Sequence, residues 1–294
     1  MPAGLLSLPP ERTERLLAGY ARTVARRRRY FYLVLAALAL LAALAGHYGE
    51  VDPAYFVRHL SAFTSYFSRI LPTLTYDHFA SDVAEWYWNL PGWLKLLADT
   101  ILIAYLATLI GALGAFATAF LAAHNTSPSR VLRFLVKRSH EFCRTVPDIV
   151  FALLFVAAFG LGPLAGILAI GIHSLGALGK LFTEVVENID MKPVEGVRSA
   201  GATFVQTMRF AVVPQVAANF ASYALLRFEI NVRSGSVVGI VGAGGIGQDL
   251  FVAIRKFYYT DVSAILLMII VTVALLDVLT ERIRYRLGRL ESGR

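Results

Sequence analysis

The sequence predicts an all-α polytopic membrane protein with about six transmembrane helices. Of its 294 residues, 57% are hydrophobic and only 16% are charged, whereas soluble domains carry roughly 25% charged residues. The apolar residues gather in long runs, and Lys and Arg cluster beside these runs, as the positive-inside rule describes. The net charge of +8 therefore indicates a membrane topology and gives no reason to expect a nucleic acid partner.

The N-terminal third contains one apolar run followed by a mixed, aromatic region. Residues 1–29 are polar and end in four consecutive arginines, so we expect a cytoplasmic N-terminal segment there. Residues 30–92 are expected to form the first transmembrane helix, at 30–46, and an outer loop whose tryptophans lie near its end. The sequence Ala43-Leu44-Ala45 imitates a signal-peptidase site, but the polar segment before it is long for a signal, which favours an uncleaved span.

Residues 93–282 are expected to form the main transmembrane domain. Five further apolar runs occur there, each at least nearly long enough to cross a bilayer: residues 94–123, 147–161, 163–182, 210–230 and 262–280. With a cytoplasmic N-terminus, counting the crossings places the loops 124–145 and 183–209 and the tail 283–294 in the cytoplasm. The first of these loops and the tail are rich in arginine, which agrees with that orientation.

A polar stretch, residues 192–214, stands between two of these spans on the predicted cytoplasmic side. Pro193 suits the first position of a helix, where its missing N–H costs nothing. Glu195 would then fall in the first turn, where the helix dipole favours an acid. Gly201 permits a sharp change of direction, and Pro214 begins the next apolar run. The simplest interpretation is an ordinary amphipathic helix and turn.

The spacing of this stretch resembles the cytoplasmic loop of ABC importer permeases, in which a Gly and a Pro follow a Glu at these intervals. Gly196 and Val197 stand where the family usually has alanines. The resemblance implies that the loop 183–209 holds a coupling helix that docks in a groove of a separate ATPase. The residues that it implies for this coupling are Glu195, Gly196, Arg198, Gly201 and Pro214.

Longer blocks narrow the resemblance to the permease subunit of phosphonate ABC importers. They are VEGVRSAGAT, FAVVPQV and EINVRSGSVVGIVGAGGIG, supported by VFALLFVAAFGLGPLAG, and the similarity covers roughly residues 95–285. The resemblance implies a type I, methionine-permease-like fold and a homodimer in the cell (inner) membrane. It also implies cytoplasmic ATPase subunits, an extracytoplasmic substrate-binding protein, and alternating access that moves phosphonate-type anions inward.

Ionisable residues inside spans cost about 2.5–3.5 kcal/mol each on insertion scales, so they are candidates for the translocation path. His173 and Ser174 lie in the fourth span. The fifth span carries a second group near its predicted outer end, in which Glu229 and Arg233 can pair along a helix while Arg227 has no local partner. Hydrogen bonding between helices and snorkelling to lipid headgroups are the simpler interpretations. The path candidates from these spans are His173, Ser174, Arg227, Glu229, Asn231 and Arg233.

The glycine-rich run that follows imitates a nucleotide site. Residues 242–247 satisfy G-x-G-x-x-G after a strand-like segment, but neither a βαβ unit nor an acid about 20 residues further on follows. Irregular backbone inside a membrane lines a cavity or is buried in protein, so we expect a gate or a close helix contact. The candidates are Gly242, Gly244, Gly245 and Gly247.

No catalytic, metal or cofactor site is expected. Gly179-Lys180 is only half a phosphate-binding loop, because Leu181 replaces the Ser or Thr that would hold magnesium. The single cysteine and the scattered histidines lack metal-ligand spacing. Alternatives remain open: phosphate, phosphite or another oxyanion as ligand, an ion-coupled secondary transporter with a relay of His173, Glu229 and Arg233, or a membrane enzyme acting on lipid phosphates.

Overall fold

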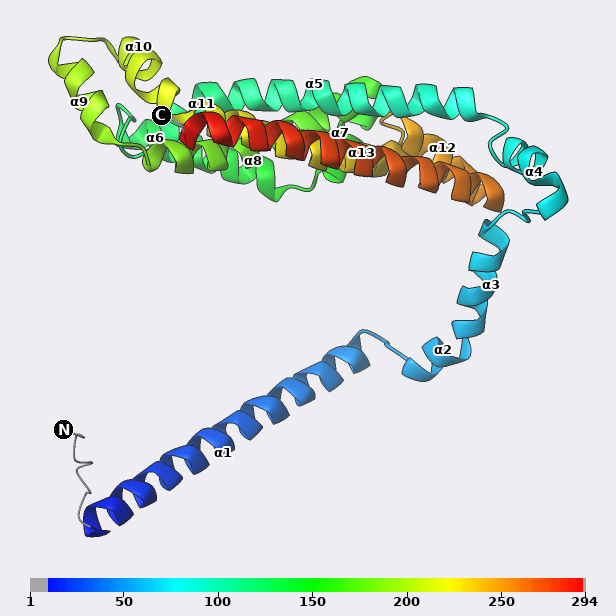
Figure 1. Ribbon diagram of the computed structural model, residues 1–294, viewed down its shortest axis with the longest axis horizontal. Coiled ribbons are helices and arrows are strands. Elements are labelled where there is room, and N and C mark those ends of the chain that lie inside the picture. The colour runs from blue at the N-terminus through cyan, green and yellow to red at the C-terminus, as the bar shows by residue number, and fades with distance from the viewer. Residues whose placement is uncertain (1–9, 293–294) are drawn as a thin grey trace, which may run out of the picture. The chain divides into compact units, whose positions relative to one another are not determined.

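The computed structural model describes residues 10–292, with side chains described for 14–286, and every regular element in this part is helical (Figure 1). The chain divides into two compact units, residues 1–66 and 67–294. This confirms the all-α prediction. The first unit is dominated by α1 (Pro10–Tyr48), a helix of 39 residues. Its length of about 58 Å exceeds a hydrocarbon core of about 30 Å, because residues 10–29 of the polar segment and the predicted first span form one continuous helix.

The predicted outer loop, residues 47–92, contains several short helices, and its position outside the membrane stays a prediction. It contains the helices α2 (Pro53–Arg58), α3 (Leu60–Ile70) and α4 (Phe79–Trp86) and the 3₁₀ turn η1 (Tyr76–His78). In the second unit, α4 is attached to the start of the last helix, because the indole Nε1 of Trp86 donates to the Thr260 carbonyl at 3.1 Å and to Ser263 Oγ at 3.0 Å.

Four long helices form the body of the second unit: α5 (Leu90–Ala122), α8 (Pro163–Glu187), α11 (Val213–Val238) and α13 (Tyr259–Ser292). The most extensive contacts of α8 are with α5, and α11 packs against α5, α8 and α13. Within this unit, α9 (Met191–Ser199) and α10 (Phe204–Thr207) lie at one end of the bundle, and α4 and α12 (Ile246–Arg255) lie at the other (Figure 1).

The predicted cytoplasmic loop 124–145 is largely helical, and the helix at the predicted third span is short; the sides of the membrane on which they lie stay predictions. Most of the loop is the amphipathic helix α6 (Arg130–Thr145), whose buried His140 bonds through Nε2 with Thr118 Oγ1 of α5 at 2.8 Å. The third span is only α7 (Asp148–Phe159), which at about 18 Å is too short to cross a membrane alone. The two helices meet at an angle of 87°, because Pro147 disfavours helical backbone in the residue before it.

The number of spans agrees with the prediction when the broken helices are counted. In the described residues, four helices are long and apolar enough to cross a membrane. The number rises to six if each of two bent pairs of helices is one span. The first pair is α6 with α7, and the second joins residues 204–241 to α12 at an angle of 47°. The predicted fifth span therefore begins earlier and ends later than residues 210–230.

A π-helical turn, Met208–Val212 (η2), joins α10 to α11. Pro214 follows at the first turn of α11. A proline lacks the N–H that would bond to the carbonyl four residues earlier, and its ring collides with that carbonyl. Widening the preceding turn accommodates both defects, so the helix continues through Pro214 without ending.

Candidate translocation path and coupling helix

A polar cluster joins the three central helices of the bundle. Asn231 is completely buried, and its Nδ2 lies 2.8 Å from Thr108 Oγ1 of α5 and 2.8 Å from Ser174 Oγ of α8. Arg227, one turn earlier on α11, donates from Nε to Ser174 Oγ at 3.1 Å. Arg227, which has no local partner, is thus hydrogen-bonded to another helix, as the simpler interpretation from the sequence expected. The partner is 53 residues away in the chain, a separation that local spacing cannot bridge.

This cluster lies near the middle of the bundle and not near the outer end of the fifth span, as the sequence suggested. Thr108 stands close to the midpoint of α5, which runs from Leu90 to Ala122. The helix that carries Arg227 continues to Val238, so its true end lies eight residues beyond the predicted one. The error arose because the polar residues of α11 lowered its hydropathy and shortened the apparent span.

Glu229 belongs to a second cluster, on the opposite face of α11. Successive helical residues turn by about 100°, so residues two apart point in nearly opposite directions. Glu229 is 4% exposed and forms the expected ion pair with Arg233. Toward α13, its Oε2 lies 3.8 Å from Arg284 Nη2 and accepts a hydrogen bond from Thr280 Oγ1 at 3.4 Å. The polar residues of α11, which the sequence treats as one group, thus form two clusters, one with Arg227 and Asn231 and the other with Glu229 and Arg233.

His173 is held between helices. Its Nδ1 lies 3.0 Å from the carbonyl oxygen of Val146, in the connection between α6 and α7. This is the interhelical hydrogen bond that the sequence left as the simpler interpretation. It ties α8 to the corner of the bent pair, and a part for His173 in the path stays a prediction.

The glycine-rich run forms the break between α11 and α12, and its strand-like beginning is helical. A 3₁₀ turn, Gly239–Val241 (η3), leads into Gly242, Gly244 and Gly245, which have φ angles of +86°, +86° and +78°. The Ile246 amide then donates to Thr100 Oγ1 of α5 at 2.9 Å. The run is packed so closely that a Cβ on Gly245 would lie 2.3 Å from that hydroxyl. The expected close helix contact is confirmed, and the gate stays a prediction.

The predicted coupling stretch contains the short helix α9. Asp190 caps it by accepting from the Lys192 amide at 3.0 Å, so the helix begins two residues before Pro193. Pro193 is therefore its third residue, and Glu195 lies beyond the first turn, which corrects the expected register. Asp190 could have been recognised as a cap from the sequence, because Asp is a preferred residue at that position.

One face of α9 is anchored and the other is exposed. Val194 is completely buried in an apolar cluster with residues of α5, α8 and α11. Glu195, Gly196 and Arg198 are exposed. Gly201, at φ +84°, reverses the chain after the helix, and Thr203 then caps α10 through a capping box with Gln206. Of the predicted coupling residues, the first three lie on the exposed face of α9, whereas Gly201 follows the helix and Pro214 lies in the first turn of α11.

Comparisons with known proteins identify the family to which this chain belongs. A family model described as "Binding-protein-dependent transport system inner membrane component" matches residues 114–291. The chain belongs to this family. It is 42% identical over 185 residues to the phosphite transport system permease protein PtxC of Stutzerimonas stutzeri, covering 63% of this chain and 67% of that protein. It is 33% identical over 276 residues to the putative phosphite permease HtxC of the same organism, covering 92% of each.

A third relative is the putative cryptic phosphonate transport system permease protein PhnE2 of Escherichia coli K12, 51% identical over 117 residues, which are 40% of this chain and 96% of that protein. Among solved structures, the inward-facing MetNI methionine ABC transporter aligns with a TM-score of 0.58 at 18% identity, over 66% of this chain and 95% of the matched one. The fold is that of type I ABC importer permeases. The chain is thus a permease component of an ABC importer, and a multi-pass protein of a cell membrane.

Proposed function

We propose that the chain forms, as a homodimer, the pore of an importer that carries phosphonate-type oxyanions, including phosphite and phosphate. Arg227 carries this proposal. Its guanidinium uses Nε for Ser174, and no other hydrogen bond of this group occurs among the side chains of residues 14–286. The two terminal amino groups of such a guanidinium match two oxygens of a phosphonyl group.

The relatives support the same chemistry, because their names include phosphite and phosphonate transport. Phosphite, phosphate and phosphonates share a tetrahedral anionic phosphorus centre, and one arginine fork recognises all of them. A soluble binding protein on the outer side would then determine the specificity among these ligands. The N-terminus is assigned to the cytoplasm, in agreement with the arginines before the first span.

Transport is driven by ATP hydrolysis in a separate ATPase, which binds the exposed face of α9. Closure of two ATPase subunits on ATP would draw the two coupling helices together and turn the pore outward, where the binding protein releases its anion. Hydrolysis would reset it. The chain itself acts as a conduit without catalytic activity, and it needs no cofactor. Lipid surrounds the spans, with nucleic acid playing no part.

Uptake by a reconstituted complex tests the ligand assignment. Permease, ATPase and binding protein are placed in liposomes, and uptake of methylphosphonate, phosphite and phosphate is measured with and without ATP. We expect Arg227→Gln to lower uptake at least about tenfold, since hydrogen bonds to charged groups contribute about 1.5–3 kcal/mol. Arg282→Gln, an exposed position on α13, serves as the control. Undiminished uptake by Arg227→Gln contradicts the proposed role.

The coupling face is tested in the same preparation. Glu195→Lys reverses the charge of an exposed side chain and leaves the buried anchor at Val194 untouched. We expect the variant permease to fold but to lose its ATPase during purification. If the ATPase stays bound and ATP-driven uptake survives, the coupling assignment of α9 is wrong.

A further inference from the structure

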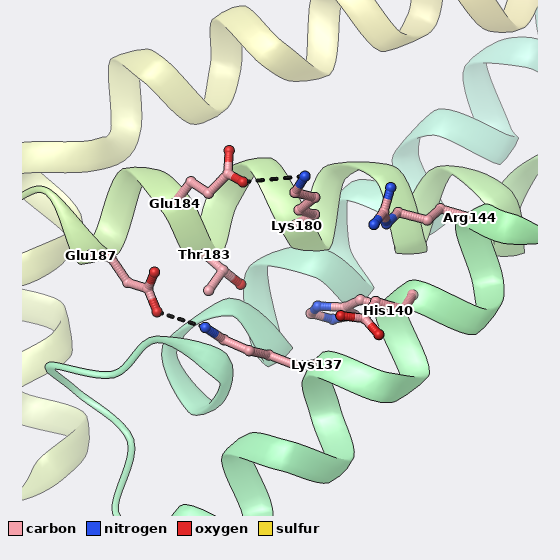
Figure 2. Close-up of a pocket in the computed structure, with 8 residues that line it drawn as sticks. Lys137, His140, Arg144, Lys180, Thr183, Glu184 and Glu187 are labelled. Atoms are coloured by element: carbon pink, nitrogen blue, oxygen red, sulfur yellow. Dashed lines mark hydrogen bonds and ion pairs between the residues drawn. The ribbon is translucent and has the colours of Figure 1, made fainter.

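The last residue of α8 connects three elements just before the coupling helix begins. Oε1 of Glu187 accepts from Lys137 Nζ of α6 at 2.9 Å and from the backbone amide of His124 at 2.9 Å. The His124 ring nitrogen Nδ1 lies 3.3 Å from the same oxygen. The Glu187 side chain is only 20% exposed. Figure 2 shows the Lys137 side chain extending from α6 toward the carboxylate of Glu187, along the pocket that α6 and α8 line.

A neighbouring acid shows what is special about this position. Glu184, three residues earlier on α8, pairs only along its own helix with Lys180 at 3.5 Å, and half of its side chain is exposed. Such exposed pairs contribute little to stability or geometry. Glu187 instead joins the end of α8 to α6 and to the segment that follows α5. The two acids therefore form a natural pair of test and control positions.

Further hydrogen bonds hold the turn between α8 and α9, residues 186–190, which we call the coupling corner. Asn125 Nδ2 donates to the Val186 carbonyl at 2.7 Å. On the other side, the Asp190 amide donates to Gln215 Oε1 at 3.1 Å, and Gln215 Nε2 donates back to the Asp190 carbonyl at 3.2 Å. Gln215 directly follows Pro214, so the corner is also bonded to the base of α11.

We propose that the coupling corner transmits displacement of α9 to α5, α6 and α11 as one body, with Glu187 as its positioning residue. A short turn between two helices is a hinge unless contacts restrain it, because a few residues can absorb a large change in backbone angles. The bonds of Glu187, Asn125 and Gln215 restrain this one. Without them, only the apolar contacts around Val194 would connect α9 to the pore helices, and less of its movement would reach them. This inference rests on the proposed grip of the ATPase on α9.

The number of anions imported per ATP hydrolysed measures this role directly. In the reconstituted complex, Glu187→Gln keeps the shape of the side chain but replaces its charge-assisted bonds. We expect ATPase binding and hydrolysis to persist while uptake per ATP falls about tenfold, because such bonds contribute about one factor of ten or more. Glu184→Gln is the matched control and should keep the parental ratio. A parental ratio in Glu187→Gln overturns the proposal.

Two further variants keep the test decisive if Glu187→Gln does not fold. Lys137→Gln removes one partner but leaves the bond from the His124 amide, and it should lower the same ratio, whereas Arg138→Gln, whose pair with Glu141 lies within α6, should not. The double variant Lys137→Glu with Glu187→Lys restores an ion pair between α6 and α8, so its ratio should exceed that of Lys137→Gln, and a lower ratio contradicts the proposal. If the parental complex shows no ATP-dependent uptake, the proposed function fails, not the coupling corner.

Discussion

Substitution of Gly247 offers a sharp test of how α11 and α12 meet. A Cβ built on Gly247 would lie 1.8 Å from the carbonyl oxygen of Ser236 and 3.2 Å from the Cα of Gly239. Cβ atoms essentially never lie within 3.0 Å of a heavy atom of a neighbouring residue. Gly247 and Ser236 would therefore have to separate by about 1.2 Å. The obstructing atoms belong to the backbone and have no alternative rotamer.

The expected cost follows from this geometry. Overpacking a well-packed site costs about 1–3 kcal/mol, and an obstacle that is backbone on both sides places Gly247→Ala near or above the upper value. In a protein of this size, 3 kcal/mol lowers the melting temperature by about 6–12 °C. Gly46→Ala is the control, because nothing lies within 4 Å of its Cβ in the exposed helix α1. There, alanine should be neutral or stabilising by about 0.5–1 kcal/mol.

Thermal unfolding of the purified permease can be followed with a thiol-reactive fluorophore. The chain has a single cysteine, and Cys143 is half-buried in α6, so it reacts fully only when the bundle opens. A melting temperature for Gly247→Ala within about 2 °C of the parent would refute the close approach of the two helices. The same assay serves the stability predictions below.

Three other substitutions probe the anchors of the second unit. Val194→Ala should cost about 1.5–3 kcal/mol, because it empties a fully buried site under α9; an unchanged melting temperature would mean that α9 is not seated there. Asn231→Ala should cost about 1–2 kcal/mol, as the bonds from its Nδ2 to Thr108 and Ser174 are each worth about 0.6 kcal/mol or more in membranes; the melting temperature and the uptake rate should both fall, and unchanged values would contradict this role. Trp86→Phe removes the indole donor to Ser263 and should destabilise by about 1 kcal/mol. Trp88 also donates to α13, to Asp261 Oδ1 at 3.1 Å, but its side chain is 65% exposed, so Trp88→Phe should lower the melting temperature less. An unchanged melting temperature for Trp86→Phe would contradict the attachment of α4.

Local pattern predicted the parts of this protein that depend on neighbours in the chain. Apolar runs indicated α1, α5, α8 and α13, since a segment's transfer to a bilayer is set by its own side chains. The pairing of Glu229 with Arg233 was also predictable, because residues four apart lie on one helical face. Errors arose in α6, whose many charges resemble a loop although the helix packs on α8 through His140 and Cys143.

The sequence alone thus determined the class of the fold, its membrane location and the presence of a short helix before Gly201. The tertiary structure decided which polar groups meet: Arg227 with Ser174, Asn231 with Thr108, and Glu187 with Lys137. Hydropathy and helical spacing act over one or two turns, whereas these contacts join residues 50 to 123 positions apart. Such pairs form only after packing has brought separate helices to the same depth.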